Sequence, residues 1–193
     1  MTITNLIIII SVIIFVIINF GDKSGDKTTL AIKYGALYPP KIFIKKEYWR
    51  FLTANFVHID IAHIFMNCYA IYYLGQFFES FLGMPAYLYL VLVSALATTM
   101  ITYYYGQYTH SHENTVTLGA SGIFYGFLGA MVALGVILQG PFMNLLRSYL
   151  YVIVINVAFT LFNSRISKTG HLGGFIGGFI AMAILIVSGI CVY

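Results

Sequence analysis

Six long stretches of this chain lack Asp, Glu, Lys and Arg. They cover residues 1–21, 61–78, 80–112, 114–146, 148–164 and 169–193. A helix of about 20 apolar residues crosses the roughly 30 Å hydrocarbon core of a bilayer. The pattern therefore predicts six transmembrane helices, at about 4–20, 59–78, 85–105, 121–138, 150–162 and 171–187.

One long polar stretch, residues 21–58, separates the first two predicted helices. Pro39-Pro40 interrupts it, and residues 41–46 mix lysine with bulky apolar side chains. Tyr48-Trp49-Arg50 follows, an aromatic and cationic cluster typical of the membrane–water boundary. We expect this loop to contain short amphipathic helices that lie in the interface.

Composition limits the class of protein. The chain is 60% hydrophobic and 8% charged, whereas soluble domains carry about 25% charged residues. We therefore expect an all-α, polytopic membrane protein, with residues 1–193 forming one bundle of six transmembrane helices and a partly interface-embedded first loop. The first stretch lacks a basic leading region and a small-residue cleavage site, so it is interpreted as a retained span rather than a signal peptide.

Charge is distributed unevenly along the chain. Seven Lys and Arg residues fall within residues 23–50, where contact with lipid headgroups is a better explanation than nucleic-acid binding. Arg165 and Lys168 would share that side of the membrane, and Arg147 would lie on the opposite side. The positive-inside rule then places the side of the first loop in the cytoplasm.

Polar residues concentrate at the start of the second predicted span. His58, Asp60 and His63 are followed by Asn67, and His63 and Asn67 are four residues apart, so they share one helix face. Ionisable residues inside a span are functional candidates. The alternative is that they only form hydrogen bonds between helices.

The fourth predicted span opens with Gly119-Ala120-Ser121-Gly122, and Tyr125 lies one turn after Ser121. A serine at a helix start has an unpaired backbone N–H, which can stabilise a developing oxyanion. The alternative is that Ser121 is an ordinary N-cap. The sixth span opens in a similar way, with His171 beside glycines in Gly170-His171-Leu172-Gly173-Gly174.

Small residues repeat every four positions on both of these spans: Gly122, Gly126 and Ala130 on the fourth, and Gly170, Gly174 and Gly178 on the sixth. This spacing lets membrane helices approach closely, which would bring the Ser121 hydroxyl within reach of the His171 ring as a nucleophile and base. Counting crossings puts Ser121, His171 and the His58–His63 cluster at a shallow depth on one side. That convergence favours catalysis over scattered packing residues.

Several other chemistries are disfavoured. No His-Glu-x-x-His motif is present, and no pair of mid-span aspartates exists. His110, His112 and Glu113 could bind a metal, but their loop has no obvious fourth ligand. No acidic residue adjoins His171, so a dyad is expected rather than a triad. Cys68 and Cys191 are poorly placed for a disulfide, and neither cofactor nor metal is expected.

The chain resembles the rhomboid family of intramembrane serine proteases. The resemblance covers most of the chain: Trp49-Arg50, His58, His63-x-x-x-Asn67, Tyr72-Tyr73-Leu74-Gly75 with Glu79, Gly119-Ala120-Ser121-Gly122 with Tyr125, and His171-x-x-Gly174-x-x-x-Gly178. Each piece is short, but their order and spacing together are specific. Gly170 stands where the family usually has alanine.

The resemblance implies a role for each matching residue. Ser121 would be the nucleophile and His171 the general base. The oxyanion hole would comprise His63, Asn67 and the Ser121 N–H. In support, Tyr125 would stack on His171, Gly119 would give the preceding loop its freedom, and His58 would assist; Trp49, Arg50 and Glu79 would be structural.

The implied function is hydrolysis of peptide bonds in or near transmembrane helices. Partners would be single-span membrane proteins and the lipid bilayer. Bacterial members of the family place the active face outside the cytoplasm, against the charge count, and we follow the resemblance in expecting a bacterial plasma-membrane protein of that orientation. Two other readings remain: a catalytically inactive relative that binds membrane clients, and a small transporter, which would be expected to carry charges or broken helices at the bilayer centre.

Overall fold

The computed structural model describes residues 1–21, 26–111, 114–164 and 166–190, and the regular elements found there are helical. In chain order they are α1 (Ile3–Val16), a π-helical turn (Ile17–Gly21), α2 (Lys27–Lys33), α3 (Pro39–Lys45), α4 (Arg50–Thr53), a 3-10 turn (Ala54–Phe56), α5 (Ile61–Leu82), α6 (Met84–Thr109), α7 (Ser121–Leu138), α8 (Gly140–Phe162) and α9 (Lys168–Val187). The expected all-α membrane architecture is confirmed.

Among the described residues, five helical segments are long and apolar enough to cross a membrane: Ile3–Gly21, Met84–Thr109, Ser121–Leu138, Gly140–Phe162 and Lys168–Val187. Helix α5, expected as the second span, is not among them although it has 22 residues. Its apolar run is interrupted by His63, Asn67, Gln76 and Glu79, which lower its mean hydropathy. The polar side chains that make α5 a functional candidate therefore also keep it out of this set of apolar helices.

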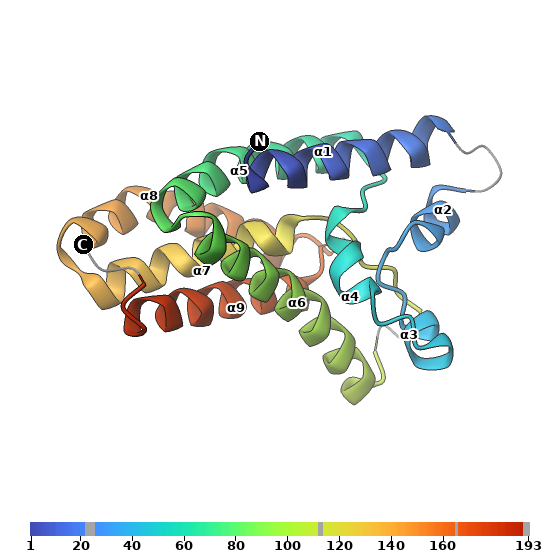
Figure 1. Cartoon of the computed structure of the whole chain (residues 1–193). Coiled ribbons are helices and arrows are strands. Elements are labelled where there is room, and N and C mark those ends of the chain that lie inside the picture. Colours follow the sequence, from blue (N-terminus) through green and yellow to red (C-terminus); the bar gives the residue numbers. More distant parts are fainter. Residues whose placement is uncertain (22–25, 112–113, 165, 191–193) are drawn as a thin grey trace.

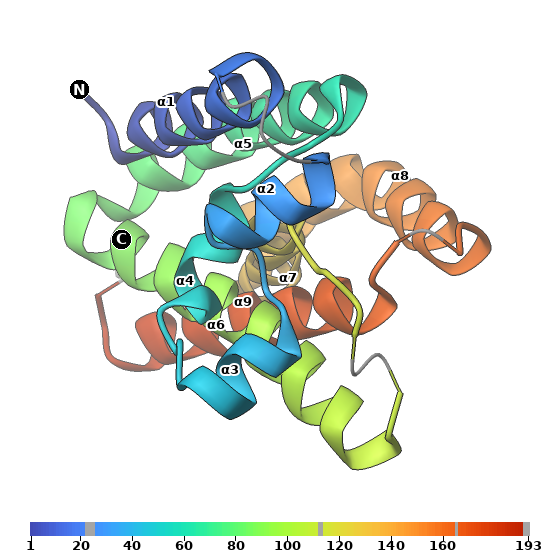
Figure 2. The same cartoon turned by 90° about the vertical axis from the view of Figure 1, so that its right-hand side faces the viewer.

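Helix α7 lies at the centre of the bundle, with the other long helices around it (Figures 1 and 2). Thirteen of its 18 residues are buried. It packs tightly on α9, because a β-carbon at Gly174 or Gly178 would overlap the carbonyl oxygen of Gly122 or Gly126. The expectation of close approach along these glycines is thus met, and the backbones of α7 and α9 touch.

Helices α1 and α5 lie side by side (Figure 1). At their shared end, Glu79 accepts hydrogen bonds from the N–H groups of Ile3 (2.6 Å) and Thr4 (2.9 Å) and from the Thr4 hydroxyl (2.6 Å). The Thr4 hydroxyl also bonds the Tyr87 hydroxyl at 2.9 Å. A carboxylate is well placed there, because the first N–H groups of a helix lack partners and carry partial positive charge.

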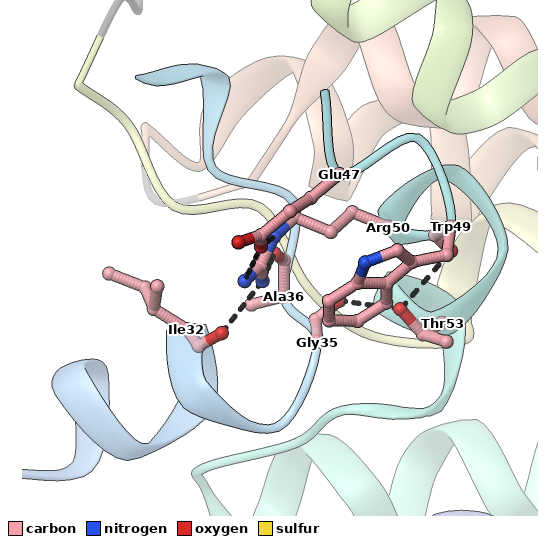
Figure 3. A network of polar contacts seen from close by, with 7 residues as sticks. All are labelled: Ile32, Gly35, Ala36, Glu47, Trp49, Arg50 and Thr53. Carbon is pink, nitrogen blue, oxygen red and sulfur yellow. Dashed lines mark hydrogen bonds and ion pairs between the residues drawn. The ribbon is translucent and has the colours of Figure 1, made fainter. Parts of the chain in front are cut away.

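The first loop folds as the short helices α2, α3 and α4 at one end of the molecule (Figure 1). Arg50 organises it: Nη1 donates to the carbonyl oxygens of Ile32 (2.7 Å) and Ala36 (2.8 Å), while Nε and Nη2 donate to Glu47. The Trp49 ring lies 4.5 Å from the guanidinium carbon (Figure 3). Because a buried charge needs partners, this network explains how Arg50 can be only 2% exposed.

One expected boundary is wrong. We expected Gly140-Pro141 to end one helix and the next to begin near residue 150, but α8 begins at Gly140. Proline is well tolerated in the first turn, where its missing N–H would have no helical partner. Arg147 consequently lies within α8. Helix α7, by contrast, has the bounds expected from the sequence.

Candidate active site

Ser121 and His171 meet at one end of the bundle. The Ser121 Oγ lies 2.9 Å from His171 Nε2, a hydrogen-bond distance. Ser121 is the first residue of α7, and the N-cap position is occupied by Ala120. The alternative reading of Ser121 as an ordinary N-cap is therefore not what the structure has. His171 lies in the first turn of α9 and is 9% exposed.

Tyr125 holds one face of the His171 ring. The two rings are stacked, with centroids 3.9 Å apart and an interplanar angle of 19°. Tyr125 lies one turn below Ser121 on α7, so the same helix presents both the hydroxyl and the ring that faces its partner. Stacking fixes the plane of the imidazole but not which of its edges faces Ser121.

The other edge of His171 contacts a residue that the sequence analysis missed. Nδ1 lies 2.8 Å from the hydroxyl of Thr160, in the last turn of α8. Thr160 also donates to the Asn156 carbonyl (2.9 Å) and contacts the Tyr125 hydroxyl, which itself donates to Asn156 (2.6 Å). The sequence did contain one signal for Thr160. It is a hydroxyl in an apolar run, and it lies at the end of the predicted fifth span that is on the same side of the membrane as Ser121 and His171.

A second polar group surrounds His58, which is fully buried just before α5. Its Nε2 accepts from the Ala120 N–H (3.2 Å) and from Asn67 Nδ2 (3.0 Å), while Nδ1 faces the Phe56 carbonyl at 3.3 Å. Nε2 therefore has no proton and Nδ1 carries it. Burial, and after it the neighbouring His63, lower the pKa of His58 to about 3, which keeps the ring neutral.

Gly119 needs to be glycine for two reasons. Its φ of +109° is unfavourable for other residues, and an added β-carbon would lie 2.6 Å from His63 Cε1 and 2.8 Å from Nε2. His63 thus lies directly against the loop that leads to Ser121. The loop is fixed by the Gly119 N–H bond to the Ala54 carbonyl (3.0 Å) and by paired hydrogen bonds between Leu37 and Thr117.

The remaining predicted residues are the oxyanion-hole candidates and those considered for a metal site or a disulfide. Among the described residues, hydrogen bonds link Asn67 to His58 and the His63 N–H to Asp60 (2.8 Å), and none joins His63 or Asn67 directly to Ser121. Within the part of the chain that the structure describes, no cluster of three or more His, Cys, Asp or Glu could hold a metal ion. His112, Glu113 and Cys191, weighed above for a metal and a disulfide, lie outside the described residues.

Comparison with known proteins identifies the family. The rhomboid domain matches residues 45–188. The chain belongs to the rhomboid family. It is 29% identical over 185 residues to the rhomboid protease GluP of Bacillus subtilis (strain 168), which covers 95% of this chain and 35% of GluP.

More distant relatives are found in other bacteria and in plants. The rhomboid protease AarA of Providencia stuartii is 24% identical over 208 residues, covering 97% of this chain and 73% of AarA. RHOMBOID-like protein 7 of Arabidopsis thaliana is 26% identical over 166 residues, covering 84% of this chain and 51% of the relative. The chain thus spans about a third of GluP and half of the plant protein. Membership, together with the apolar helices, makes this an integral membrane protein.

Proposed function

We propose that this protein is an intramembrane serine endopeptidase that uses Ser121 as nucleophile and His171 as general base. The observation that carries the proposal is the 2.9 Å contact between Ser121 Oγ and His171 Nε2. A nucleophile and base within hydrogen-bond reach are the signature of covalent acyl transfer. Two of the relatives, GluP and AarA, are named rhomboid proteases.

The reaction follows from the placement of these groups. Ser121 Oγ attacks the scissile carbonyl carbon while His171 Nε2 takes the hydroxyl proton. The resulting imidazolium gives that proton to the leaving amine nitrogen, which releases the first product and leaves an acyl-enzyme. His171 then takes a proton from a water molecule, the water oxygen attacks the ester, and Ser121 is restored.

The negative charge that develops on the carbonyl oxygen needs donors that are already in place. The Ser121 N–H is one, because the first N–H groups of α7 have no partner within the helix. Asn67 Nδ2 has two hydrogens, and the bond to His58 uses one of them. His63, beside Gly119, is the third proposed donor. His58 supports this hole by holding Asn67 and the Ala120 N–H at the two ends of one hydrogen-bonded bridge.

The proposed substrates are single-span membrane proteins that reach the site through the lipid bilayer. Ser121 and His171 both lie in first helical turns, at the end of the bundle that holds the first loop. A substrate helix must unwind to expose a peptide bond there, and lipid cannot satisfy the freed backbone groups. Small or helix-breaking residues near the cut should therefore favour cleavage.

We further propose that the protein lies in a bacterial plasma membrane with its active face outside the cytoplasm. The family resemblance supports this orientation, although nine of the ten Lys and Arg residues were counted on the active side. Loop residues that fold into the interface need not follow a rule based on simple connecting loops. Digestion of an N-terminal tag by external protease in intact cells would show the opposite orientation.

The decisive experiment uses the purified full chain in detergent with a single-span model substrate that carries small residues near its outer end. We expect cleavage by the parent protein and none by Ser121→Ala or His171→Ala. Undiminished cleavage by Ser121→Ala would end the proposal. If the parent does not cleave, labelling of Ser121 by a fluorophosphonate separates a selective protease, which is labelled, from an inactive client-binding relative, which is not.

A further inference from the structure

Thr160 is the one buried residue in the half of α8 that approaches the dyad. Only Leu146 and Thr160 are buried among the 23 residues of this helix, and Thr160 is 6% exposed. Buried hydroxyls are almost always hydrogen-bonded. This one contacts His171 Nδ1, the Asn156 carbonyl and the Tyr125 hydroxyl. A helix whose side chains are otherwise mostly exposed or only partly buried therefore places one polar group against the dyad.

A count of protons shows which atom donates in the hydrogen bond between His171 Nδ1 and the Thr160 hydroxyl. Nε2 of His171 can accept the Ser121 proton only if it carries a lone pair, so the neutral ring must have its proton on Nδ1. Nδ1–H then donates to the Thr160 oxygen at 2.8 Å. The single Thr160 proton goes to the Asn156 carbonyl at 2.9 Å, and the Tyr125 proton lies between the same carbonyl, at 2.6 Å, and the Thr160 oxygen. Thr160 then donates once and accepts from both His171 and Tyr125, so each of the three donors has an acceptor.

The opposite tautomer fits less well. With the proton on Nε2, the ring would donate towards Ser121, and Nδ1 would need a proton from Thr160. That proton would have to leave the Asn156 carbonyl, which would lose its bond from the Thr160 hydroxyl. The tautomer that can deprotonate Ser121 therefore keeps one more hydrogen bond than the tautomer that cannot.

Thr160 also supplies what the stacked tyrosine lacks. A half-turn of the imidazole about its bond to the β-carbon keeps the ring plane, so Tyr125 stacking alone does not prevent it. The half-turn would put carbon atoms where Nδ1 and Nε2 now lie, and would break the bonds to both Thr160 and Ser121. When His171 becomes positively charged, its Nδ1–H bond to Thr160 becomes charge-assisted and strengthens.

We propose that Thr160 is a positioning residue that holds His171 in the Nδ1–H tautomer with Nε2 facing Ser121. The site then has three members, with a neutral hydroxyl in the place where serine proteases with a triad have a carboxylate. This inference rests on the proposed roles of Ser121 and His171. It adds that the orientation and the tautomer of the His171 ring depend on the packing of α8 against the site.

The test compares Thr160→Val, which keeps the side-chain shape and removes the hydroxyl, with Thr160→Ser, which restores it. The matched control is Thr98→Val, because Thr98 is a buried threonine of α6 that also donates to the carbonyl four residues earlier, at 2.8 Å. The first measurement is the rate at which a fluorophosphonate labels Ser121. General base catalysis contributes roughly 10²–10⁴-fold to such reactions. We expect Thr160→Val to lower the labelling rate by about tenfold or more, and Thr160→Ser to recover most of that rate.

The second measurement reads the tautomer directly, from the nitrogen chemical shifts of ¹⁵N-histidine in the detergent-solubilised full chain. The parent, Thr160→Ser and Thr98→Val should show His171 with its proton on Nδ1, assigned by comparison with His171→Ala. A parent spectrum with the proton on Nε2 overturns the inference, and so does a Thr160→Val variant that labels at the parent rate. If Thr160→Val fails to fold, the parent spectrum and Thr160→Ser still decide the matter.

These readouts separate this inference from the proposed function. If Ser121 is labelled, Thr160→Val slows labelling and the model substrate is not cleaved, Thr160 keeps its role and the proposed choice of substrate is wrong. If cleavage occurs and Thr160→Val leaves both labelling and tautomer unchanged, the protease stands and the role of Thr160 is wrong. In active preparations, Thr160→Val should lower kcat more than it changes KM, since it acts on the base.

Discussion

Helices α7 and α8 follow each other in sequence and differ sharply in how they are held. Thirteen of 18 residues are buried in α7, against two of 23 in α8. Helix α7 packs backbone to backbone on α9 through glycine, whereas α8 presents large apolar side chains outward, among them Tyr151, Val154, Ile155 and Phe162. The same bundle thus combines α7, which is mostly buried, with α8, which is mostly exposed or only partly buried.

The candidate site is divided between these two kinds of helix. The proposed nucleophile and base lie on the tightly packed pair, α7 and α9, where their spacing cannot vary without moving backbone against backbone. Thr160 lies on the loosely held helix. The distance between Ser121 and His171 is therefore set by the core, while the orientation of the His171 ring also depends on α8.

The largest expected effect comes from separating the packed pair. Gly174→Ala would place a methyl group against the Gly122 carbonyl oxygen, next to Ser121. Overpacking typically costs about 1–3 kcal/mol, and more where backbone must move. We expect a lower thermal unfolding midpoint in detergent and loss of Ser121 labelling. Gly21→Ala is the control, since its nearest neighbour is 4.0 Å away; equal behaviour of the two variants would contradict the account of this interface.

A smaller loss of activity is expected when a proposed oxyanion donor on α5 is removed while the packed pair of α7 and α9 is left intact. Asn67→Ala deletes the amide that bonds His58 at 3.0 Å. Removal of one such donor typically costs about 10²–10³ in kcat. We expect that loss in cleavage of the model substrate, with a thermal midpoint close to that of the parent. A full-rate Asn67→Ala enzyme would exclude Asn67 from the oxyanion hole.

The smallest effect is expected from loosening α8 at its other anchor. Leu146 fits over Gly135 of α7, and Leu146→Ala empties that contact. We expect faster hydrogen exchange in Gly140–Phe162 with α7 and α9 unchanged, and a modest reduction in activity through Thr160. Leu150→Ala, on an exposed position of α8, is the control. Faster exchange throughout the bundle would show that α8 is not separately held.

The sequence alone predicts much of the architecture, because membrane helices must be long and apolar. The bounds of α7 coincide with those expected, and the glycine spacing correctly places α9 against it. The start of α8 was missed because Gly140-Pro141 resembles a helix end and also suits a helix start. The low hydropathy of α5 was not anticipated as a distinguishing property.

At the candidate site, motif residues were easier to find than their supporting partners. Ser121 and His171 lie beside glycines at matching ends of two spans, so counting crossings brings them together. Thr160 has no such neighbours, and a threonine in a membrane helix usually bonds only its own backbone. Its contact with His171 depends on how α8 packs, which a linear pattern does not encode. The roles of all these site residues stay predictions: Ser121, His171, His63, Asn67, Tyr125, Gly119 and His58.

The carboxylate of Glu79 at the head of α1 has a consequence for biosynthesis. Thr4 and Glu79 are 75 residues apart in the chain, and at about 5–20 residues per second the ribosome needs roughly 4–15 s to cover that interval. Helix α1 is therefore synthesised before the acceptor for its leading amides exists. During those seconds water or lipid headgroups must satisfy those amides, because hydrocarbon cannot.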